Sequence, residues 1–265
     1  MSDKTGVDWA DSSWTVTSGC SKVSAGCVNC YAIKAAWRMS HNPNPKVSAA
    51  FSGTVEKDAS GRLDWSGTIR CLDDRLGWPV KWGKPRRIFV DSLADLFHPD
   101  VPFEFIEAVY GVMRREDRHT YQLLTKRPSI AAEFFSEHRD KFNYALPHVW
   151  FGVTVESQQW TSRIPTLLSL PVCHRWLSIE PLLSPVQLEP EWLEDSAGLD
   201  WIVIGAETGK GARGLARHWV TDLIDQCKAA GVPVFVKRNI PNYWLEGYGV
   251  SYLQELPASM EAQNG

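Results

Sequence analysis

Three cysteines lie close together near the N-terminus, in the segment SGCSKVSAGCVNCYA (18–32), with the spacing C-x6-C-x2-C. Thiolates are the natural ligands of zinc and of iron–sulfur clusters, so Cys20, Cys27 and Cys30 are candidates to hold a metal. Glycines within this segment allow sharp turns, and one short loop can therefore bring all three sulfurs to a single site. The spacing predicts a metal centre rather than three separate core residues.

The identity of the metal depends on whether a fourth protein ligand exists. A structural zinc site normally has four protein ligands, and the nearest candidates for the fourth are His41 and Cys71. Neither residue has a typical paired spacing. A 4Fe-4S cluster held by three cysteines instead leaves one iron open to a substrate or cofactor. We therefore favour a 4Fe-4S cluster, with zinc as the alternative metal.

Polar and charged residues also stand at or just beyond the ends of six apolar runs further along the chain. They are Asp91, Asp95, Thr125, Lys126, Arg127, Glu156, Glu180, Glu207, Lys237 and Arg238. If the runs are parallel strands, their C-terminal ends meet at one edge, where the βα loops of α/β proteins form active sites. The pattern predicts a polar pocket of mixed charge at that edge.

Two loop features belong to the same edge. His98 follows Asp91 in the loop after the first of the six runs and is a candidate general acid–base or metal ligand, because imidazole titrates near neutral pH. The segment GAETGKGARGL (205–215) is rich in glycine but lacks the residue order of a phosphate-binding loop. We interpret it as a flexible loop around Glu207 and a candidate lid.

The six apolar runs themselves predict strands that are buried on both faces, as in a parallel sheet covered by helices. They are RRIFVDS (86–92), TYQLLTKR (120–127), HVWFGVTVES (148–157), RWLSIEP (175–181), DWIVIGAE (200–207) and VPVFVKR (232–238). SWTVT (13–17) is a candidate first strand just before the cysteines. Segments with helical periodicity lie between strands, at 101–117, 129–142, 158–170 and 216–231. This alternation predicts an α/β fold, namely a partial or complete TIM-type (β/α) barrel with parallel strands.

The chain reads as a single barrel domain over residues 1–265, a normal length for one α/β barrel. Two polar-alternating runs around a DASG turn, within about 50–70, predict a β-hairpin insertion. The tail from about 240 to 265 reads as irregular.

Composition limits the partners and the compartment. A net charge of −3 argues against nucleic-acid binding that depends on bulk positive charge. No apolar stretch is long enough for a membrane span, and the polar N-terminus lacks the apolar core of a signal peptide. We therefore expect a cytoplasmic protein whose cysteines stay reduced. Thirteen tryptophans indicate large flat contacts, in the core or in a pocket for a planar ligand.

Eight blocks between residue 14 and about 240 carry a resemblance to a known family. They are WTVTSGC (14–20), VSAGCVNCYA (23–32), PRRIFVDSLADLFH (85–98), LLTKRP (123–128), VWFGVTVE (149–156), WLSIEPLL (176–183), WIVIGAE (201–207) and GVPVFVK (231–237). On these blocks the chain resembles a family of phage and prophage proteins of unassigned activity, which are distantly similar to radical S-adenosylmethionine enzymes. Those enzymes usually space their cysteines as C-x3-C-x2-C, whereas the first gap here has six residues.

The resemblance implies an iron–sulfur-dependent enzyme that cleaves S-adenosylmethionine reductively and acts on an unknown substrate. Its phage association suggests a substrate related to nucleotides or nucleic acids. Cys20, Cys27 and Cys30 would hold the cluster. The residues that would face S-adenosylmethionine are Asp91, Ser92, Asp95, Glu156 and Glu207. The catalytic candidates are Glu156, Glu180 and Glu207, which would orient cofactor or substrate, Lys126 and Lys237, which would meet an anionic group, and His98.

Two other functions stay open. The first is a non-catalytic zinc-binding module of phage or prophage origin, with His41 or Cys71 as the fourth ligand. The second is a metal-independent barrel hydrolase that uses the acids at the strand ends and whose cysteines are structural.

Overall fold

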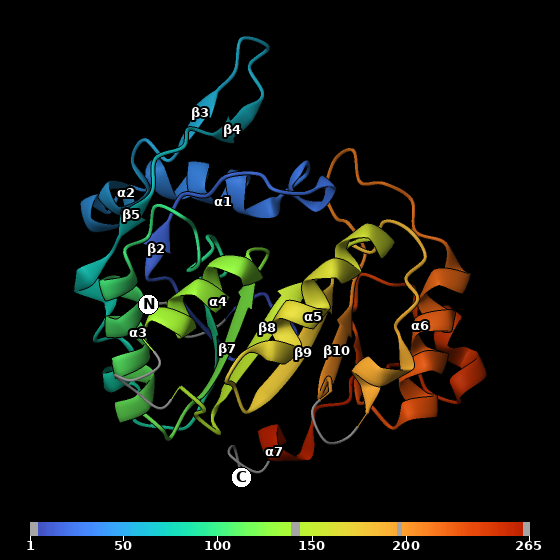
Figure 1. Ribbon diagram of the computed structural model, residues 1–265. Coiled ribbons are helices and arrows are strands. Elements are labelled where there is room, and N and C mark those ends of the chain that lie inside the picture. Colours follow the sequence, from blue (N-terminus) through green and yellow to red (C-terminus); the bar gives the residue numbers. More distant parts are fainter. Residues whose placement is uncertain (1–4, 139–143, 195–197, 262–265) are drawn as a thin grey trace.

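Seven parallel strands form the framework of the computed structural model, which describes residues 5–138, 144–194 and 198–261. In their order across the sheet they are β1 (Ser12–Trp14), β6 (Arg87–Val90), β7 (Thr120–Thr125), β8 (Val149–Thr154), β9 (His174–Ile179), β10 (Trp201–Ile204) and β11 (Val234–Val236). The sheet is curled into half of a barrel with β1 and β11 at its edges (Figure 1). The expected α/β class and parallel sheet are confirmed, in the form of an open half-barrel.

The apolar runs form these strands because both faces of the sheet are covered. Outward residues such as Leu123, Phe151 and Leu177 pack with the helices into the main core. Inward residues, among them Trp150 and Trp176, form a second core on the inner face of the sheet. Several of the tryptophans thus fill the interior of the half-barrel.

Helices cover the outer face of the sheet (Figure 1). They are α3 (Phe103–Arg115), α4 (Pro128–Glu137), α5 (Ile164–Ser169) and α6 (Arg217–Ala230). The expected helices at 101–117 and 216–231 are confirmed to within two residues at each end. The segment 158–170 is instead divided into a 3-10 helix, η4 (Gln158–Arg163), and α5, because Pro165 has no backbone N–H and fits the first turn of a new helix. Of the segment 129–142, α4 takes the first part, and 139–142 lie outside the described residues.

A further layer crosses the mouth of the half-barrel, at the C-terminal ends of its strands. After β2 (Thr17–Ser18), the cysteine loop (residues 18–32) contains η1 (Ala25–Cys27) and leads into α1 (Tyr31–Ser40). Figure 1 shows α1 lying across the mouth, followed by α2 (Pro45–Phe51).

The expected hairpin insertion is confirmed. β3 (Val55–Lys57) pairs antiparallel with β4 (Leu63–Trp65), and the hairpin projects away from the half-barrel (Figure 1). The Asp58 carboxylate closes the turn by accepting the N–H groups of Ser60 and Arg62, each at 2.9 Å. After the hairpin, β5 (Arg70–Cys71) pairs with β2, and η2 (Asp73–Arg75) and η3 (Pro79–Lys81) lead back to β6.

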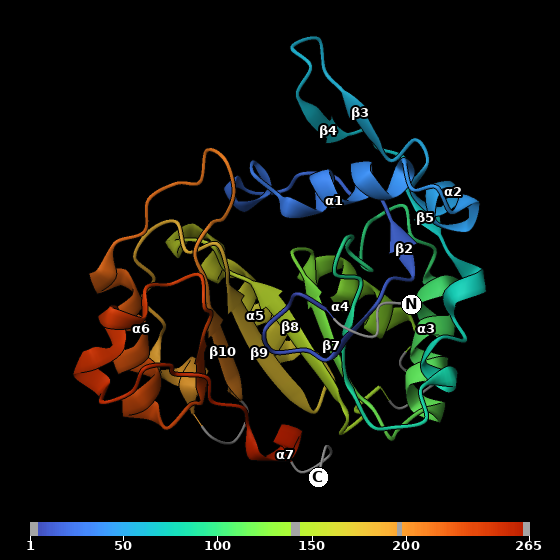
Figure 2. The same cartoon turned by 180° about the vertical axis from the view of Figure 1, so that it is seen from behind.

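The chain ends close the other sides of the half-barrel. The first described residues run across the open side of the sheet (Figure 2), and the Asp8 carboxylate accepts the N–H of Arg238 at 3.3 Å. Between β9 and β10 the chain forms η5 (Pro190–Leu193). The tail expected to be irregular contains η6 (Asn242–Tyr248) and the short helix α7 (Ala258–Glu261), which lies at the end opposite α1.

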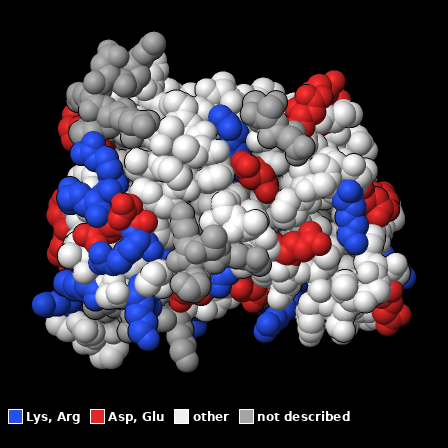
Figure 3. Space-filling view, turned by 90° about the horizontal axis from the view of Figure 1, so that it is seen from below, with Lys and Arg blue, Asp and Glu red and all other residues white. Residues whose placement is uncertain are grey.

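The outer surface carries charges of both signs. Seen from the end opposite α1, lysine and arginine are most frequent at one side, with aspartate and glutamate among them (Figure 3). This face therefore has no broad region of positive charge, in line with the net charge of −3. Within the described ranges, no helix combines the length and the apolar character that a membrane crossing requires.

Candidate functional site

A cavity of about 1060 Å³ opens between α1 and the C-terminal ends of the strands. Residues expected at this edge from four strand ends and the cysteine loop line it together: Cys27, Cys30, Lys126, Glu180, Glu207 and Lys237. The structure therefore brings the predicted polar side chains and two of the three cysteines to one place.

The Cys30 sulfur lies at the start of α1. Cys30 directly precedes the helix, so the N–H groups of Ala32 and Ile33 in the first turn lie near the sulfur, although the Cys30 side chain accepts no cap hydrogen bond. Burial raises the pKa of the Cys30 thiol, while these N–H groups and the nearby Lys126 oppose the rise. The beginning of the helix thus offsets part of the burial that disfavours a thiolate at this position.

Each of the other two cysteines also has a cation beside it. The Arg127 guanidinium lies 3.8 Å from the Cys20 sulfur and 2.9 Å from the Asp95 carboxylate. Burial, together with Asp95, raises the pKa of Cys20 to about 12, and Arg127 opposes this rise.

Arg163 is a cation in the neighbourhood of Cys27. Burial lowers the pKa of Arg163, and the neighbouring Glu156 and Cys27 oppose this shift. The three cysteines therefore face three separate positive groups, Arg127, Arg163 and Lys126.

The thiols are neighbours without being in coordination geometry. Cys30 influences the pKa of Cys20, and Cys27 influences that of Cys30. The Cys20 sulfur is directed at the Ser21 carbonyl oxygen, 3.5 Å away. Within the part of the chain that the structure describes, no three His, Cys, Asp or Glu side chains form a ready metal-binding group. The donor type alone fits a thiolate-bound metal.

The two candidates for a fourth ligand differ in their distance from the cysteine loop. His41 caps the far end of α1, and ten helical residues separate it from Cys30 by about 15 Å. Cys71 pairs with Thr17 between β2 and β5. Burial raises the pKa of Cys71 to about 11, helped by Asp73 and Asp91, and none of the three clustered cysteines contributes.

Glu156 lies under the cysteine loop, at the end of β8, and is fully buried. Its carboxylate is 3.2 Å from the Lys126 ammonium and 2.9 Å from the Arg163 guanidinium, and it accepts the hydroxyl of Ser24. Burial alone raises the pKa of Glu156, but Lys126, Arg163 and Ser24 outweigh it and hold the pKa below its ordinary value. Glu156 therefore stays ionised and joins the rim of the half-barrel to the cysteine loop.

Gly26 permits this close approach. A β-carbon at Gly26 would lie 2.5 Å from the Glu156 Oε1, closer than real contacts allow. The glycine is thus needed for packing against a carboxylate, besides the turn that the sequence suggested.

A second ion pair faces the cavity. The Lys237 ammonium, just after β11, lies 2.7 and 3.0 Å from the two oxygens of Glu180, just after β9. The Asn239 amide adds a contact at 3.4 Å. Gly205, at the end of β10, leaves room for this carboxylate, because a β-carbon there would lie 2.8 Å from the Glu180 side chain.

The loop 205–215 is tied to the cysteine loop through Glu207. The Glu207 carboxylate accepts the Arg213 Nε at 2.9 Å and the Asn29 amide at 3.0 Å. Arg213 also donates to the carbonyl oxygen of Ala25 at 2.9 Å. Hydrogen bonds from Arg213, aided by Asn29, lower the pKa of Glu207 to about 2. Figure 1 shows this loop beside the beginning of α1.

Comparison with known proteins gives a family. Residues 4–244 match the family described as "protein of unknown function", DUF5131. The chain belongs to this family. The match contains the cysteine loop and all seven strands of the half-barrel. No curated protein and no solved structure matches the chain.

In this DUF5131 chain, the buried Glu156 does not line the cavity, although it was expected to face a cofactor, and two further acids with the same expected role, Asp91 and Asp95, do not line it either. The Asp91 carboxylate accepts the N–H groups of Val16 and Thr17 at 2.7 and 2.8 Å and the Thr17 hydroxyl at 2.8 Å. Burial raises the pKa of Asp91 to about 7, and these hydrogen bonds oppose the rise. Asp95 binds Arg127 and the Thr125 hydroxyl. Both acids position the chain around the cysteine loop, whereas the expected Ser92 and Glu207 do line the cavity.

His98 is likewise a support for the cysteine loop of the DUF5131 chain. Its Nδ1 accepts the N–H of Asp100 at 3.2 Å, so its Nε2 carries the proton and donates to the Ser21 hydroxyl at 2.8 Å. The side chain is 3% exposed and lies outside the cavity. Burial lowers the pKa of His98, aided by Arg127, which favours this neutral form.

Sequence reasoning missed several groups at the site. Asn239 comes one residue after the expected Arg238, so the rule that found the strand ends would have found it. Asn29 stands inside the cysteine motif, but its partner, Glu207, is 178 positions away in the chain. Arg163 carries no local signal, because it lies in a segment expected to be an ordinary helix.

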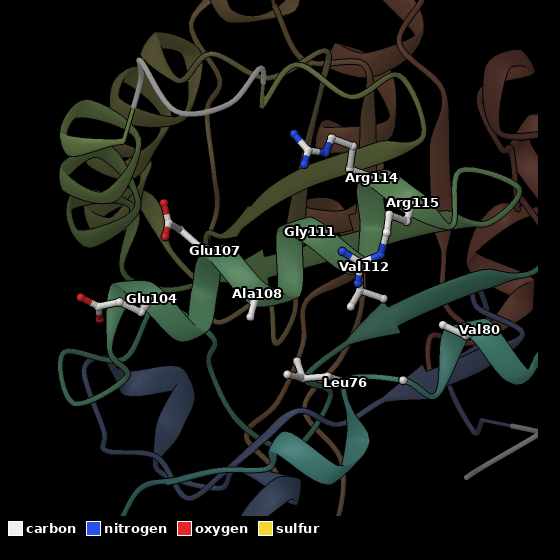
Figure 4. Close-up of a pocket in the computed structure, with 10 residues that line it drawn as sticks. Leu76, Val80, Glu104, Glu107, Ala108, Gly111, Val112, Arg114 and Arg115 are labelled. Carbon is white, nitrogen blue, oxygen red and sulfur yellow. The ribbon is translucent and has the colours of Figure 1, made fainter.

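A second cavity of the DUF5131 chain, about 460 Å³, lies on the outer surface along α3 (Figure 4). Leu76 and Val80 face Ala108 and Val112 of α3 across it. None of the expected site residues lines it.

Proposed function

We propose that this chain is an iron–sulfur-dependent enzyme similar to radical S-adenosylmethionine enzymes, with a 4Fe-4S cluster held by Cys20, Cys27 and Cys30. One observation carries the proposal. The three thiols lie at the mouth of a parallel half-barrel, each beside a cation, and two of them line the cavity at the strand ends.

The charges around the cysteines suit this cofactor. A cluster held by three thiolates has a net negative charge that grows on reduction, and nearby charges and hydrogen bonds set its potential. Arg127, Arg163 and Lys126 would balance that charge. Cysteines with a purely structural role usually pack as small apolar residues, which need no such cations.

The number of ligands favours a cluster over a structural zinc ion. A closed zinc site needs four ligands. His41 lies about 15 Å from Cys30 along α1, and Cys71, which pairs with Thr17 beside the cysteine loop, is not among the groups that shift the pKa of Cys20 or Cys30. Three cysteines suit a cluster with one iron open towards the cavity, and Cys27 and Cys30 line that cavity.

In the enzymes it resembles, the reduced cluster supplies the electron that cleaves S-adenosylmethionine, and the resulting radical removes hydrogen from the substrate. The residues of this chain would bind and orient the molecules involved. Glu180 and Lys237 present a fixed pair of opposite charges to the cavity, and Glu207 closes it at the loop 205–215. Glu156 would position the cysteine loop through Ser24.

The remaining parts of the proposal rest on the resemblance. The half-barrel supports a partial TIM-type barrel, and the substrate is proposed to be a nucleotide or nucleic acid of phage or prophage metabolism. All six cysteines are free thiols, which suits a reducing compartment such as the cytoplasm.

Anaerobic purification with iron and sulfide reconstitution, followed by optical and paramagnetic resonance spectra, tests the proposal. We expect about four irons per chain and a cluster spectrum. Cys27→Ala should abolish both, whereas the control Cys173→Ala, at an exposed cysteine outside the loop, should change neither. S-adenosylmethionine should be cleaved only when the cluster is reduced.

The alternatives have their own outcomes. One zinc per chain without an iron chromophore would overturn the proposal in favour of a zinc-binding module. Hydrolytic activity that Cys27→Ala retains would overturn it in favour of a metal-independent hydrolase.

A further inference from the structure

Arg75 is a buried cation that has no acidic side chain within ion-pair distance in the described part of the chain. The residue is 6% exposed and lines the cavity. Its guanidinium forms no hydrogen bond or ion pair with any residue that the structure describes. Removing a charge from water without a partner is costly, so such a group is retained where a ligand supplies the opposite charge.

The fold holds Arg75 firmly in this position. Arg75 ends η2, and its carbonyl oxygen accepts the indole N–H of Trp14 at 2.8 Å. Trp14 is fully buried in β1. The guanidinium lies over the ring of Trp78 at 4.9 Å and over that of Phe51 at 5.6 Å. Two rings at its faces leave its N–H edge, which lies in the guanidinium plane, to bind a ligand.

Nearby acids do not account for the charge. Burial lowers the pKa of Arg75, and Asp74 and Asp91 oppose this from beyond ion-pair distance. Asp91 is already engaged by Val16 and Thr17. Asp74 is exposed to solvent.

We propose that Arg75 binds an oxyanion, a phosphate or a carboxylate, on the ligand of this cavity. The fork of N–H donors matches the paired oxygens of either group. Arg38, exposed at the cavity wall, adds a second positive charge, and Phe51, Trp78 and Leu93 provide an apolar wall for the rest of the ligand. The ligand class is therefore an oxyanion joined to an apolar or planar body.

The part of α1 that lines this cavity gives the distance between the bound anion and the cysteines. Tyr31, Ala35, Arg38 and Met39 line it from α1, at positions that share one face of a helix. From Tyr31, next to Cys30, to Arg38 the helix rises by about 10 Å. A ligand held at Arg75 and Arg38 can therefore extend beneath α1 towards Cys30. This placement rests on the proposed function only in taking Cys30 as part of the reaction centre.

Titration with inorganic phosphate and, separately, acetate tests the site, at constant ionic strength and with tryptophan fluorescence as the readout, because Trp78 contacts Arg75. Arg75→Met should weaken binding of the preferred anion at least about tenfold, since charge-assisted paired hydrogen bonds are lost. Arg75→Lys keeps the charge but loses the paired N–H donors. Its affinity for the anion should lie between that of the wild type and that of Arg75→Met. Circular dichroism and thermal unfolding check that both variants fold.

A matched control is Arg86→Met. Arg86 also lies over a tryptophan ring, that of Trp82 at 5.3 Å, but is outside the cavity, so its removal should change binding less than about twofold. Saturable binding of either anion that Arg75→Met loses supports the site and identifies the group it takes. Binding of neither anion, or binding that Arg75→Met retains, overturns it.

The same titration on Cys27→Ala separates this inference from the proposed function. Phosphate or acetate binding should survive in the cluster-free protein. If the wild-type chain binds no iron yet binds the anion through Arg75, the proposed function fails and the oxyanion site stands.

Discussion

The guanidinium of Arg127 lies 3.8 Å from the sulfur of Cys20, although the two residues are 107 positions apart in the chain. Arg127 lies between β7 and α4, directly before the helix, and also binds the Asp95 carboxylate and the carbonyl oxygen of Ser21. A single buried cation therefore fastens the cysteine loop to the rim of the half-barrel. The position of Cys20 is set by the sheet as well as by its own loop.

Arg127→Gln should destabilise the fold strongly. The Arg127 and Asp95 side chains are only 7% and 8% exposed, and removing one partner of a buried ion pair costs roughly 3–5 kcal/mol. Urea unfolding measures this loss. Arg87→Gln is the control, because its pair with Asp11 is more exposed and should cost less than about 1 kcal/mol. Equal losses in the two variants would contradict the assigned role of Arg127.

Gly26→Ala should loosen the contact between Glu156 and the cysteine loop. The added methyl group would meet the buried carboxylate at 2.5 Å, and overpacking of this kind costs about 1–3 kcal/mol. We expect lower stability together with lower iron loading after reconstitution. Gly83→Ala, where a methyl group meets nothing within 4 Å, should leave both unchanged. Normal iron loading in Gly26→Ala would show that Glu156 does not position the cysteines.

The Glu207–Arg213 pair should make stability depend on acid pH. The pKa of Glu207 is about 2 in the folded chain, below its ordinary 4.5, so the folded state favours the ionised form. The contribution is therefore complete above about pH 4.5 and is lost as the pH falls towards 2. Because Arg213 is 36% exposed, solvent screening limits it to about 1 kcal/mol. The difference in unfolding free energy between the wild type and Arg213→Gln should shrink between pH 6 and pH 3, and a constant difference would refute the assignment.

Asn29→Ala should release the loop 205–215 from the cysteine loop. The Asn29 amide donates to both Glu207 and the carbonyl oxygen of Gly211, so its loss removes two contacts between the loops. Hydrogen exchange of residues 208–214 should become several-fold faster, because local opening costs less. Lys210→Ala, at an exposed position of the same loop, serves as the control. Unchanged exchange in Asn29→Ala would mean that Arg213 alone holds the loop.

The sheet could be predicted from sequence because its strands are buried on both faces. A run such as HVWFGVTVES is apolar at nearly every position, and this pattern distinguishes it from a surface strand. The rule that active sites form at the C-terminal ends of parallel strands then placed Glu180 and Lys237 together, and they lie 2.7 Å apart.

The same rule could not separate the groups that line the cavity from those that support it. Asp91 and Glu180 both follow a strand, yet Asp91 adopts a positive φ of 55° and turns its carboxylate to the backbone of Val16 and Thr17. The role of Arg75 could not be predicted from the sequence for another reason. Its surroundings come from β1, α2 and the residue before η3, and no local sequence pattern indicates such contacts.

The position of α1 across the mouth has a thermodynamic consequence. This helix begins directly after Cys30, and one of its faces lines the same cavity that Arg75 lines. If metal binding orders the start of α1, it also shapes the space beneath the helix, and such coupling must be reciprocal. If the metal raises the affinity for the ligand by some factor, the ligand raises the affinity for the metal by the same factor. A chain with its cavity filled should then release iron to a chelator more slowly than an empty one.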